Sequence, residues 1–125
     1  MAKKILIVDD SETIRQQVRF ALPRDDFVVL EASDGLEGLE QVAREDDIAL
    51  VLIDVNMPRL GGLDMLERLR AEPKHGEVAV LMLTTEVERS LIDRAKRAGA
   101  KGWLIKPVKP ELLLAAVTKF VRSGG

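Results

Sequence analysis

Residues 5–11 read Ile5-Leu6-Ile7-Val8-Asp9-Asp10-Ser11, so that four apolar side chains are followed at once by two acids and a hydroxyl. Four more short apolar runs occur further along the chain, at residues 27–30, 50–53, 78–83 and 103–105. Runs of this length and composition are typical of β-strands. Because several of them show no alternation with polar residues, they favour a parallel sheet that is covered on both faces.

The segments between these runs have the spacing of amphipathic helices. Their apolar side chains form five stripes: Ile14, Val18, Ala21 and Leu22; Leu36, Leu39 and Val42; Leu63, Leu66 and Leu69; Leu91, Ala95 and Ala98; Leu113, Ala116, Val117 and Phe120. Pro73 is expected to limit the third helix, Gly99 to stop the fourth and Pro110 to begin the fifth. Strict alternation of strands and helices requires crossover connections, which are right-handed in nearly all cases and place helices on both faces of the sheet. The sequence therefore predicts an α/β fold with a doubly wound, five-stranded parallel sheet.

The chain has the size and composition of one domain. It has 125 residues, of which 46% are hydrophobic and 32% are charged, and this balance provides a core and argues against disorder. No apolar run approaches the roughly 18 residues of a membrane span, and the first residues do not resemble a signal peptide. The absence of cysteine excludes disulfides and zinc–thiolate sites and fits a cytoplasmic protein. The single histidine, His75, excludes sites built from several histidines.

The net charge of −2 hides a difference between the two halves of the chain. Residues 1–62 carry 7 basic and 13 acidic side chains, whereas residues 63–125 carry 12 basic and 8 acidic ones. Only four aromatic residues are present, and no basic run is interleaved with them. The sequence therefore gives little support to nucleic-acid binding.

Polar residues follow four of the five apolar runs. In open α/β sheets, ligands bind at the carboxyl ends of the strands, and the groups expected there are Asp9, Asp10, Asp54, Thr84, Thr85 and Lys106. A single acid after a strand is usually a turn residue or a helix N-cap, but acids, a hydroxyl and a lysine at one edge predict a functional site. Oxygen ligands without cysteine or a histidine cluster suit Mg²⁺. Together these groups are sufficient for phosphoryl transfer to a carboxylate.

At these positions the sequence resembles the receiver domain of two-component response regulators, and most closely the single-domain chemotaxis type. The resemblance covers about the whole chain. It is carried by residues 5–11, by Asp54-Val55-Asn56-Met57-Pro58 with Gly61-Gly62, by Thr84-Thr85 and by Lys106-Pro107. It implies a flavodoxin-like (βα)5 fold with strand order 2-1-3-4-5. Residues 1–122 would form the receiver domain, and residues 123–125 are expected to be a flexible tail.

The resemblance also implies a role for each site residue. Asp54 would be the nucleophile that becomes phosphorylated, and Asp9, Asp10 and Asp54 would hold Mg²⁺ together with the backbone carbonyl of Asn56. Lys106 would contact the phosphate, and the peptide bond to Pro107 would be cis. Thr84 would bind a phosphate oxygen and move on phosphorylation, with Trp103 as the aromatic switch residue behind it.

Three residues depart from the family pattern. Trp103 is bulkier than the usual switch aromatic, so that an inward rotamer is in question. Thr85 replaces a small residue, commonly Ala, and its β-branch could narrow access to the site. Gly61 replaces a frequent acid, a change that could loosen the loop after Asp54.

The resemblance further implies partners and a mode of action. The phosphodonor would be a sensor histidine kinase, and the chain would be a signalling domain that catalyses only its own phosphorylation and dephosphorylation. A downstream protein would bind the fourth helix, fifth strand and fifth helix, a region rich in basic residues: Arg89, Arg94, Lys96, Arg97, Lys101, Lys109, Lys119 and Arg122. An acidic partner and an ordinary solvated face both fit these charges. A monomer or weak dimer is expected.

Several alternatives remain open from the sequence. A chemotaxis output is expected, although a receiver domain cut from a larger or hybrid regulator would have the same motifs. A phosphatase of the haloacid-dehalogenase type would need a second acid at Asn56. A flavodoxin would have a first turn rich in Ser, Thr and Gly in place of Asp9 and Asp10. A receiver that no longer accepts phosphate is disfavoured by the intact acids.

Overall fold

Five parallel strands form one sheet in the order β2-β1-β3-β4-β5. The structure, a computed structural model, describes residues 2–85 and 87–123. The strands in this part of the chain are β1 (Lys3–Val8), β2 (Phe27–Ala32), β3 (Ile48–Ile53), β4 (Ala79–Thr84) and β5 (Gly102–Ile105). The helices are α1 (Glu12–Ala21), α2 (Gly35–Arg44), α3 (Gly62–Leu69), α4 (Arg89–Arg97) and α5 (Pro110–Ser123). The predicted α/β class and strand order 2-1-3-4-5 are confirmed.

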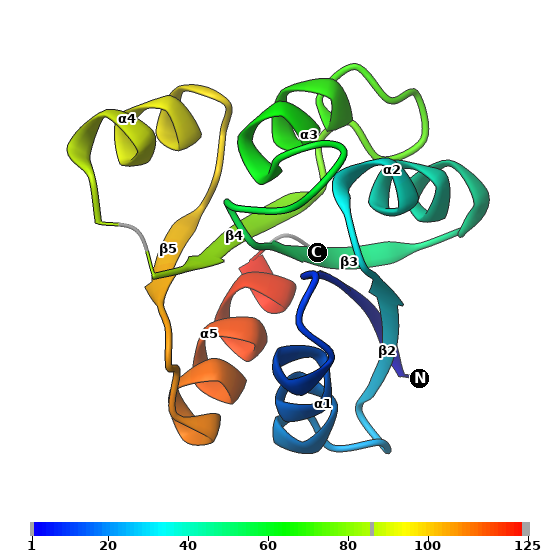
Figure 1. Cartoon of the computed structure of the whole chain (residues 1–125). Coiled ribbons are helices and arrows are strands. Elements are labelled where there is room, and N and C mark those ends of the chain that lie inside the picture. The colour runs from blue at the N-terminus through cyan, green and yellow to red at the C-terminus, as the bar shows by residue number, and fades with distance from the viewer. Residues whose placement is uncertain (1, 86, 124–125) are drawn as a thin grey trace.

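Helices cover both faces of the sheet, as the uninterrupted apolar strands predict. Helices α1 and α5 lie on one face, and α2, α3 and α4 lie on the other (Figure 1). Strand β1 supplies both layers, because Leu6 and Val8 belong to the core beneath α2 to α4, whereas Ile5 and Ile7 belong to the core beneath α1 and α5. All four of these side chains have no exposed surface. The central strands are therefore fixed from two sides, which gives their carboxyl ends a rigid base.

Four strands are longer than the apolar runs that predict them, and one of these, β5, begins one residue early at Gly102. Strand β1 begins at Lys3, β3 begins at Ile48 and β2 continues through Glu31 and Ala32. Lys3 pairs with Phe27, and Ile7 pairs with Glu31 in the parallel ladder. Strand pairing uses backbone groups, so polar side chains at the rim of the sheet can join a ladder that the apolar pattern does not reveal.

The helix ends agree with their capping residues. The side chain of Ser11 accepts a hydrogen bond from the Ile14 N–H, and Asp34 caps α2 in the same way through the Glu37 N–H. Gly99 has a φ of +86°, the left-handed conformation that ends α4. At the end of α5, Ser123 is the last helical residue, and Gly124 and Gly125 of the expected tail lie outside the described residues.

Within residues 2–85 and 87–123, no helix has the length and apolar character that a bilayer span needs.

Candidate functional site

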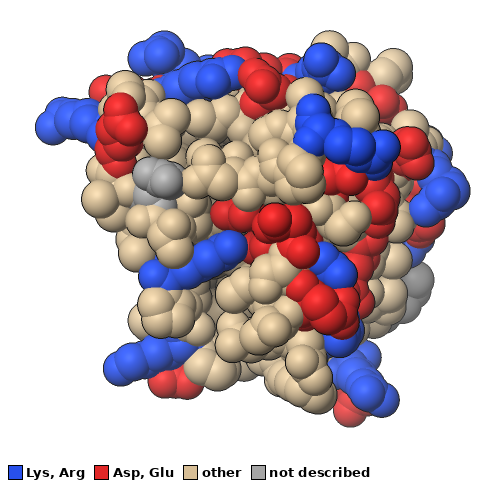
Figure 2. All heavy atoms as spheres, in the orientation of Figure 1, with Lys and Arg blue, Asp and Glu red and all other residues tan. Residues whose placement is uncertain are grey.

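Three aspartates meet where β1 and β3 end. Asp9 and Asp10 directly follow β1, and Asp54 directly follows β3, its neighbour in the sheet. One carboxylate oxygen from each residue lies within 4.8 Å of the other two. Acidic side chains gather at the centre of this face of the molecule (Figure 2). The carboxyl edge of the sheet thus brings together the acids that the sequence assigns to one site.

Asp9 is the innermost acid and is held at both oxygens. Its side chain has no exposed surface, Oδ1 accepts a hydrogen bond from the Ser11 N–H at 2.9 Å, and Oδ2 accepts one from Lys106 Nζ at 2.6 Å. These contacts fix the orientation of the carboxylate. Asp10, in contrast, is exposed at the mouth of the site.

Asp54 is buried beside a second negative charge. Its residue is 6% exposed, and its N–H donates to the Val8 carbonyl at 2.9 Å, which ties it to the end of β1. Burial, followed by the charge of Asp9, raises the pKa of Asp54 to about 6, although Lys106 acts in the opposite direction. A carboxylate whose charge is disfavoured in this way attracts any cation that can reach it.

Lys106 lies between the two buried acids. Its Nζ is 2.6 Å from Asp9 Oδ2 and 3.3 Å from Asp54 Oδ1. The lysine follows β5 directly, and its N–H donates to the Thr84 carbonyl at 2.8 Å, so the ladder between β4 and β5 continues to this point. The Lys106–Pro107 peptide bond is cis, as the resemblance implies. The ammonium group is therefore placed to contact an anion that binds at Asp54.

The other predicted site residues lie around this centre. Thr84 is the last residue of β4 and is fully buried, at the same edge of the sheet. Asn56 is exposed in the loop between β3 and α3, two residues after Asp54. Trp103 in β5 pairs with Met82 in β4 and is partly buried against the core beneath α2 to α4. Thr84 and Trp103 thus connect the acidic edge with the face that carries α4.

The loop after Asp54 closes tightly at Gly62. A Cβ atom on Gly62 would lie 2.0 Å from the Asp54 carbonyl oxygen, a distance that no side chain can occupy. A Cβ atom on Gly61 would meet only the Val55 carbonyl oxygen, at 3.5 Å, and Gly61 has a φ of −70°. The close approach of the backbone, which the two glycines together suggest, is thus needed at Gly62 alone.

Arg15 supports the site, although no sequence pattern singles it out. Its Nη1 donates to the Asp9 carbonyl at 2.6 Å, and its Nε donates to Glu31 at 3.1 Å. Its side chain is 14% exposed. The arginine therefore braces the turn that carries Asp9 and Asp10. From the sequence, Arg15 is indistinguishable from a charged residue on the exposed side of a helix. Its role becomes apparent only from the packing of α1 against β2.

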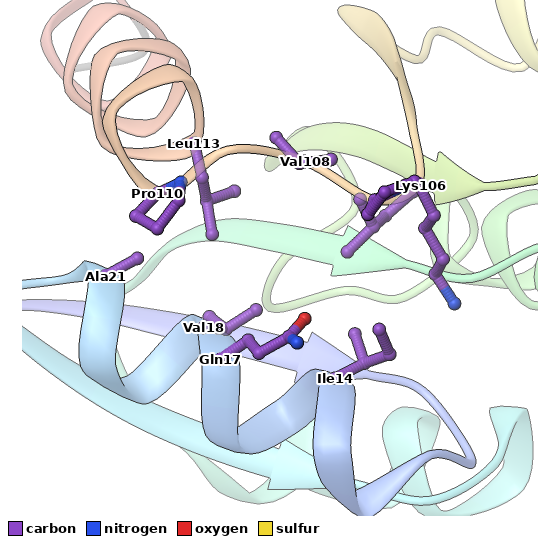
Figure 3. A pocket seen from close by; sticks show the side chains of 10 residues that line it. Ile14, Gln17, Val18, Ala21, Lys106, Val108, Pro110 and Leu113 are labelled. Carbon is purple, nitrogen blue, oxygen red and sulfur yellow. The ribbon is translucent and has the colours of Figure 1, made fainter.

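An apolar groove adjoins the lysine. It has a volume of about 170 Å³ and lies between α1 and the start of α5. Figure 3 shows Ile14, Gln17 and Val18 of α1 directed toward Val108 and Leu113, with Lys106 at one end of the groove. The site thus combines acidic side chains and a lysine at the sheet edge with an apolar groove beside the lysine.

The ligand set fits a hard divalent cation. All three candidate side-chain ligands are carboxylates, and the chain contains no cysteine. His75 is engaged elsewhere, since it hydrogen-bonds the Val42 carbonyl and the Ile48 N–H. Oxygen ligands of this kind suit Mg²⁺ and do not suit a structural zinc ion.

Comparison with known proteins places this arrangement among signalling domains. A family model described as "Response regulator receiver domain" matches residues 5–118. The chain is 35% identical over 124 residues to a chemotaxis protein CheY homolog of Campylobacter jejuni, with 97% of this chain and 94% of that protein covered. A solved structure of CheY4 from Vibrio cholerae has a TM-score of 0.88 at 36% identity and covers 96% of this chain and 99% of that one.

Similar domains also occur in longer proteins. The transcriptional regulatory protein SrrA of Staphylococcus aureus is 32% identical over 122 residues, which cover 98% of this chain and 49% of that protein. The likeness therefore extends to a regulator of which the matched region is about half.

Proposed function

The chain belongs to the response regulator receiver domain family, and we propose that it is a switch in which Asp54 accepts a phosphoryl group in the presence of Mg²⁺. One observation carries this proposal. Asp54 is a buried carboxylate with a lysine ammonium 3.3 Å away and two further acids close enough to share a cation with it. A nucleophile, a positive charge for the phosphate and a cation site are the parts that this chemistry needs.

Each residue has a role in the transfer. A carboxylate oxygen of Asp54 forms a bond to phosphorus while the bond from phosphorus to the donor breaks, and the electron pair returns to the donor. Lys106 Nζ stabilises the phosphate oxygens, for which its present contacts with Asp9 and Asp54 already position it. Asp9, Asp10, Asp54 and the backbone carbonyl of Asn56 would hold Mg²⁺, which supplies positive charge that offsets the repulsion between the acids and the phosphate.

The signal would leave the site through β4 and β5. The Thr84 hydroxyl is proposed to bind a phosphate oxygen, and the Thr84 carbonyl already accepts a hydrogen bond from the Lys106 N–H. A movement of either residue would therefore affect the other. Trp103 lies in β5, three residues before Lys106, and is proposed to respond to this movement as the switch aromatic. Phosphorylation would in this way change the surface of α4, β5 and α5.

The phosphodonor is proposed to be a phosphohistidine on a sensor kinase. The sequence has no Gly-x-x-x-x-Gly-Lys loop that would hold a nucleotide, so the phosphate must come from a separate molecule. The apolar groove between α1 and α5 offers a donor protein a packing surface beside Lys106 (Figure 3). Such a kinase acts on cytoplasmic receivers, and we place this chain in the cytoplasm.

The output surface combines exposed apolar and basic groups. Val87, Ile105 and Leu112 are 67%, 45% and 59% exposed, and Lys101 and Lys109 lie nearby in the chain. Arg94, which the sequence also assigns to this surface, pairs instead with Asp64 and Glu67 at 2.7 Å. We propose that Lys101 and Lys109 favour an acidic target. Unchanged target binding after both are replaced by Glu would disprove this preference.

A chemotaxis output is the preferred assignment, because the likeness to single-domain chemotaxis proteins covers nearly the full length of both chains. The alternative is an output through another domain, which the likeness to SrrA keeps open.

Acetyl phosphate supplies the test, because it is a small donor that needs no kinase. With Mg²⁺ present the chain should gain one phosphoryl group, and the gain should be absent without Mg²⁺ and in Asp54→Asn. In Lys106→Ala we expect labelling to slow about 100-fold. Asp46→Asn is the control, since Asp46 is an exposed acid that pairs with Lys74. Labelling that persists in Asp54→Asn would contradict the proposal.

A further inference from the structure

The loop from Asp54 to Gly61 carries Asn56 and is held by the start of α2. The Gly35 N–H donates to the Leu60 carbonyl at 3.2 Å. Beside this bond, Arg59 makes a two-pronged ion pair with Asp34, with Nε 2.8 Å from Oδ2 and Nη2 3.0 Å from Oδ1. The loop is thus attached to α2 by one backbone bond and one ion pair, three residues beyond Asn56.

Arg59 holds an unfavourable backbone conformation at this point. Its φ is +64°, in the left-handed region, which costs a residue other than glycine about 1 kcal/mol or more. Such a conformation persists only where surrounding contacts enforce it. The ion pair with Asp34 is one such contact, and the backbone bond at the next residue is a second.

Asp34 is a fixed anchor for the arginine. The residue is 6% exposed, and its Oδ1 also accepts the Glu37 N–H at 2.9 Å as the N-cap of α2. Burial favours the neutral acid, but the Glu37 N–H and the Arg59 guanidinium outweigh it and lower the pKa of Asp34. The carboxylate therefore remains charged and oriented at neutral pH.

Helix α2 itself packs too closely against its neighbours to shift. A Cβ atom on Gly35 would lie 2.5 Å from the Leu60 carbonyl oxygen, and one on Gly38 would lie 2.8 Å from the Met65 side chain and 3.0 Å from that of Val8. Close approach at two positions of α2 means that the helix, the loop and the sheet fit against one another. The ion pair accordingly links the loop to a rigid element.

We propose that Arg59 is a positioning residue for the cation site: its ion pair with Asp34 fixes the loop between β3 and α3 on α2 and so holds the backbone of Asn56 in place for Mg²⁺. This inference rests on the proposed function, because it concerns the same cation. Neither Arg59 nor Asp34 is one of the three candidate ligands, which are Asp9, Asp10 and Asp54. Both act through the loop, as residues outside the ligand set commonly do in metal sites.

Two substitutions separate positioning from simple electrostatics. Arg59→Gly removes the ion pair and relieves the positive φ, so the fold should retain most of its stability. Asp34→Asn keeps an N-cap side chain of the same size but removes the charge that binds Arg59. Removal of a positive charge should by itself strengthen cation binding, whereas removal of a negative charge should weaken it. Positioning alone predicts that both variants bind Mg²⁺ more weakly.

The measurement is calorimetric titration of the whole chain with Mg²⁺, alongside denaturant unfolding without metal. We expect about a tenfold loss of affinity in each variant and no further loss in the double variant. Arg24→Gly, at an exposed turn, is the control and should bind as the wild type does. Unchanged or tighter binding in Arg59→Gly, or additive losses in the double variant, would overturn the proposal while the proposed function stands. A wild-type chain that binds no Mg²⁺ would overturn both.

Discussion

The charge of Asp54 destabilises the folded protein in the absence of a cation, and this effect follows from the position of the residue. The carboxylate is buried at the end of a central strand, beside the fully buried Asp9. Lys106 offsets only part of the repulsion, so the pKa of Asp54 is raised from 3.8 to about 6. A group that is placed where it destabilises the folded protein is typical of a reactive site and unusual for a structural one.

The first prediction concerns this residue and pH. Since the pKa of Asp54 is higher in the folded than in the unfolded state, its contribution to stability is most favourable below about pH 4 and is lost as the pH rises to about 6. At pH 7.5 the penalty is about 3 kcal/mol, because the pKa rises from 3.8 to about 6 and each pKa unit corresponds to about 1.4 kcal/mol. Asp54→Asn should therefore have the higher free energy of unfolding at pH 7.5, measured with urea and a chelator.

The pH series also contains the control for that comparison. The difference between Asp54→Asn and the wild type should disappear below about pH 4, where the carboxyl is neutral in both states. Equal stabilities at pH 7.5, or a difference that stays constant down to pH 4, would contradict the assignment of the pKa shift.

At the scale of the elements, two neighbouring glycines differ in their tolerance of a side chain. Gly62 begins α3 against the Asp54 carbonyl, whereas Gly61 has space and an ordinary φ. Gly62→Ala should lower the free energy of unfolding by about 2 kcal/mol or more, because the loop must move away from β3. Gly61→Ala, the matched control, should change it by less than about 1 kcal/mol. Urea unfolding compares the two, and equal losses would refute the close approach at Gly62.

His75 joins elements at the opposite end of the sheet. The Ile48 N–H donates to Nε2 at 3.2 Å, which leaves the proton on Nδ1 to bond the Val42 carbonyl at 2.9 Å. The ring thereby connects α2 to the start of β3, and His75 is 8% exposed.

The third prediction follows from those two bonds. His75→Ala should cost about 2 kcal/mol of unfolding free energy, because a buried N–H loses its partner. Lys74→Ala, next to it, should cost about 0.5 kcal/mol or less, since its pair with Asp46 is exposed. Thermal and urea unfolding would compare the stabilities of the two variants. An unchanged free energy of unfolding in His75→Ala would contradict the prediction and would show that water replaces the ring.

For the whole molecule, the sequence reveals the layers and the position of the site. Residues 5–8 predict burial on both faces, and both cores contain residues of β1. Asp9, Asp10 and Asp54 could be placed at one edge because the carboxyl ends of parallel strands share it, and the strand order that makes β1 and β3 neighbours is implied by the resemblance to receiver domains. The layers of the fold could be predicted because they depend on the periodicity of apolar residues, which neighbouring positions of the sequence show directly.

Contacts between distant segments could not be predicted. Asp34 and Arg59 are 25 residues apart, and nothing in either residue type indicates a positive φ at Arg59. The brace from Arg15 to the Asp9 carbonyl and the two bonds of His75 depend equally on packing. Lys3 and Glu31 join strands through their backbones, which side-chain patterns do not report. The sequence thus locates the reactive groups, and the structure adds what holds them in position.

The central claim is that Asp54 becomes phosphorylated, and the most direct measurement identifies the residue chemically. An aspartyl phosphate is reduced by borohydride to homoserine, which mass spectrometry of peptides can locate. After treatment with acetyl phosphate and Mg²⁺ followed by borohydride, we predict homoserine at position 54 and none in a sample prepared without Mg²⁺. Homoserine at another acid, or its absence at position 54 despite phosphoryl uptake, would contradict the account.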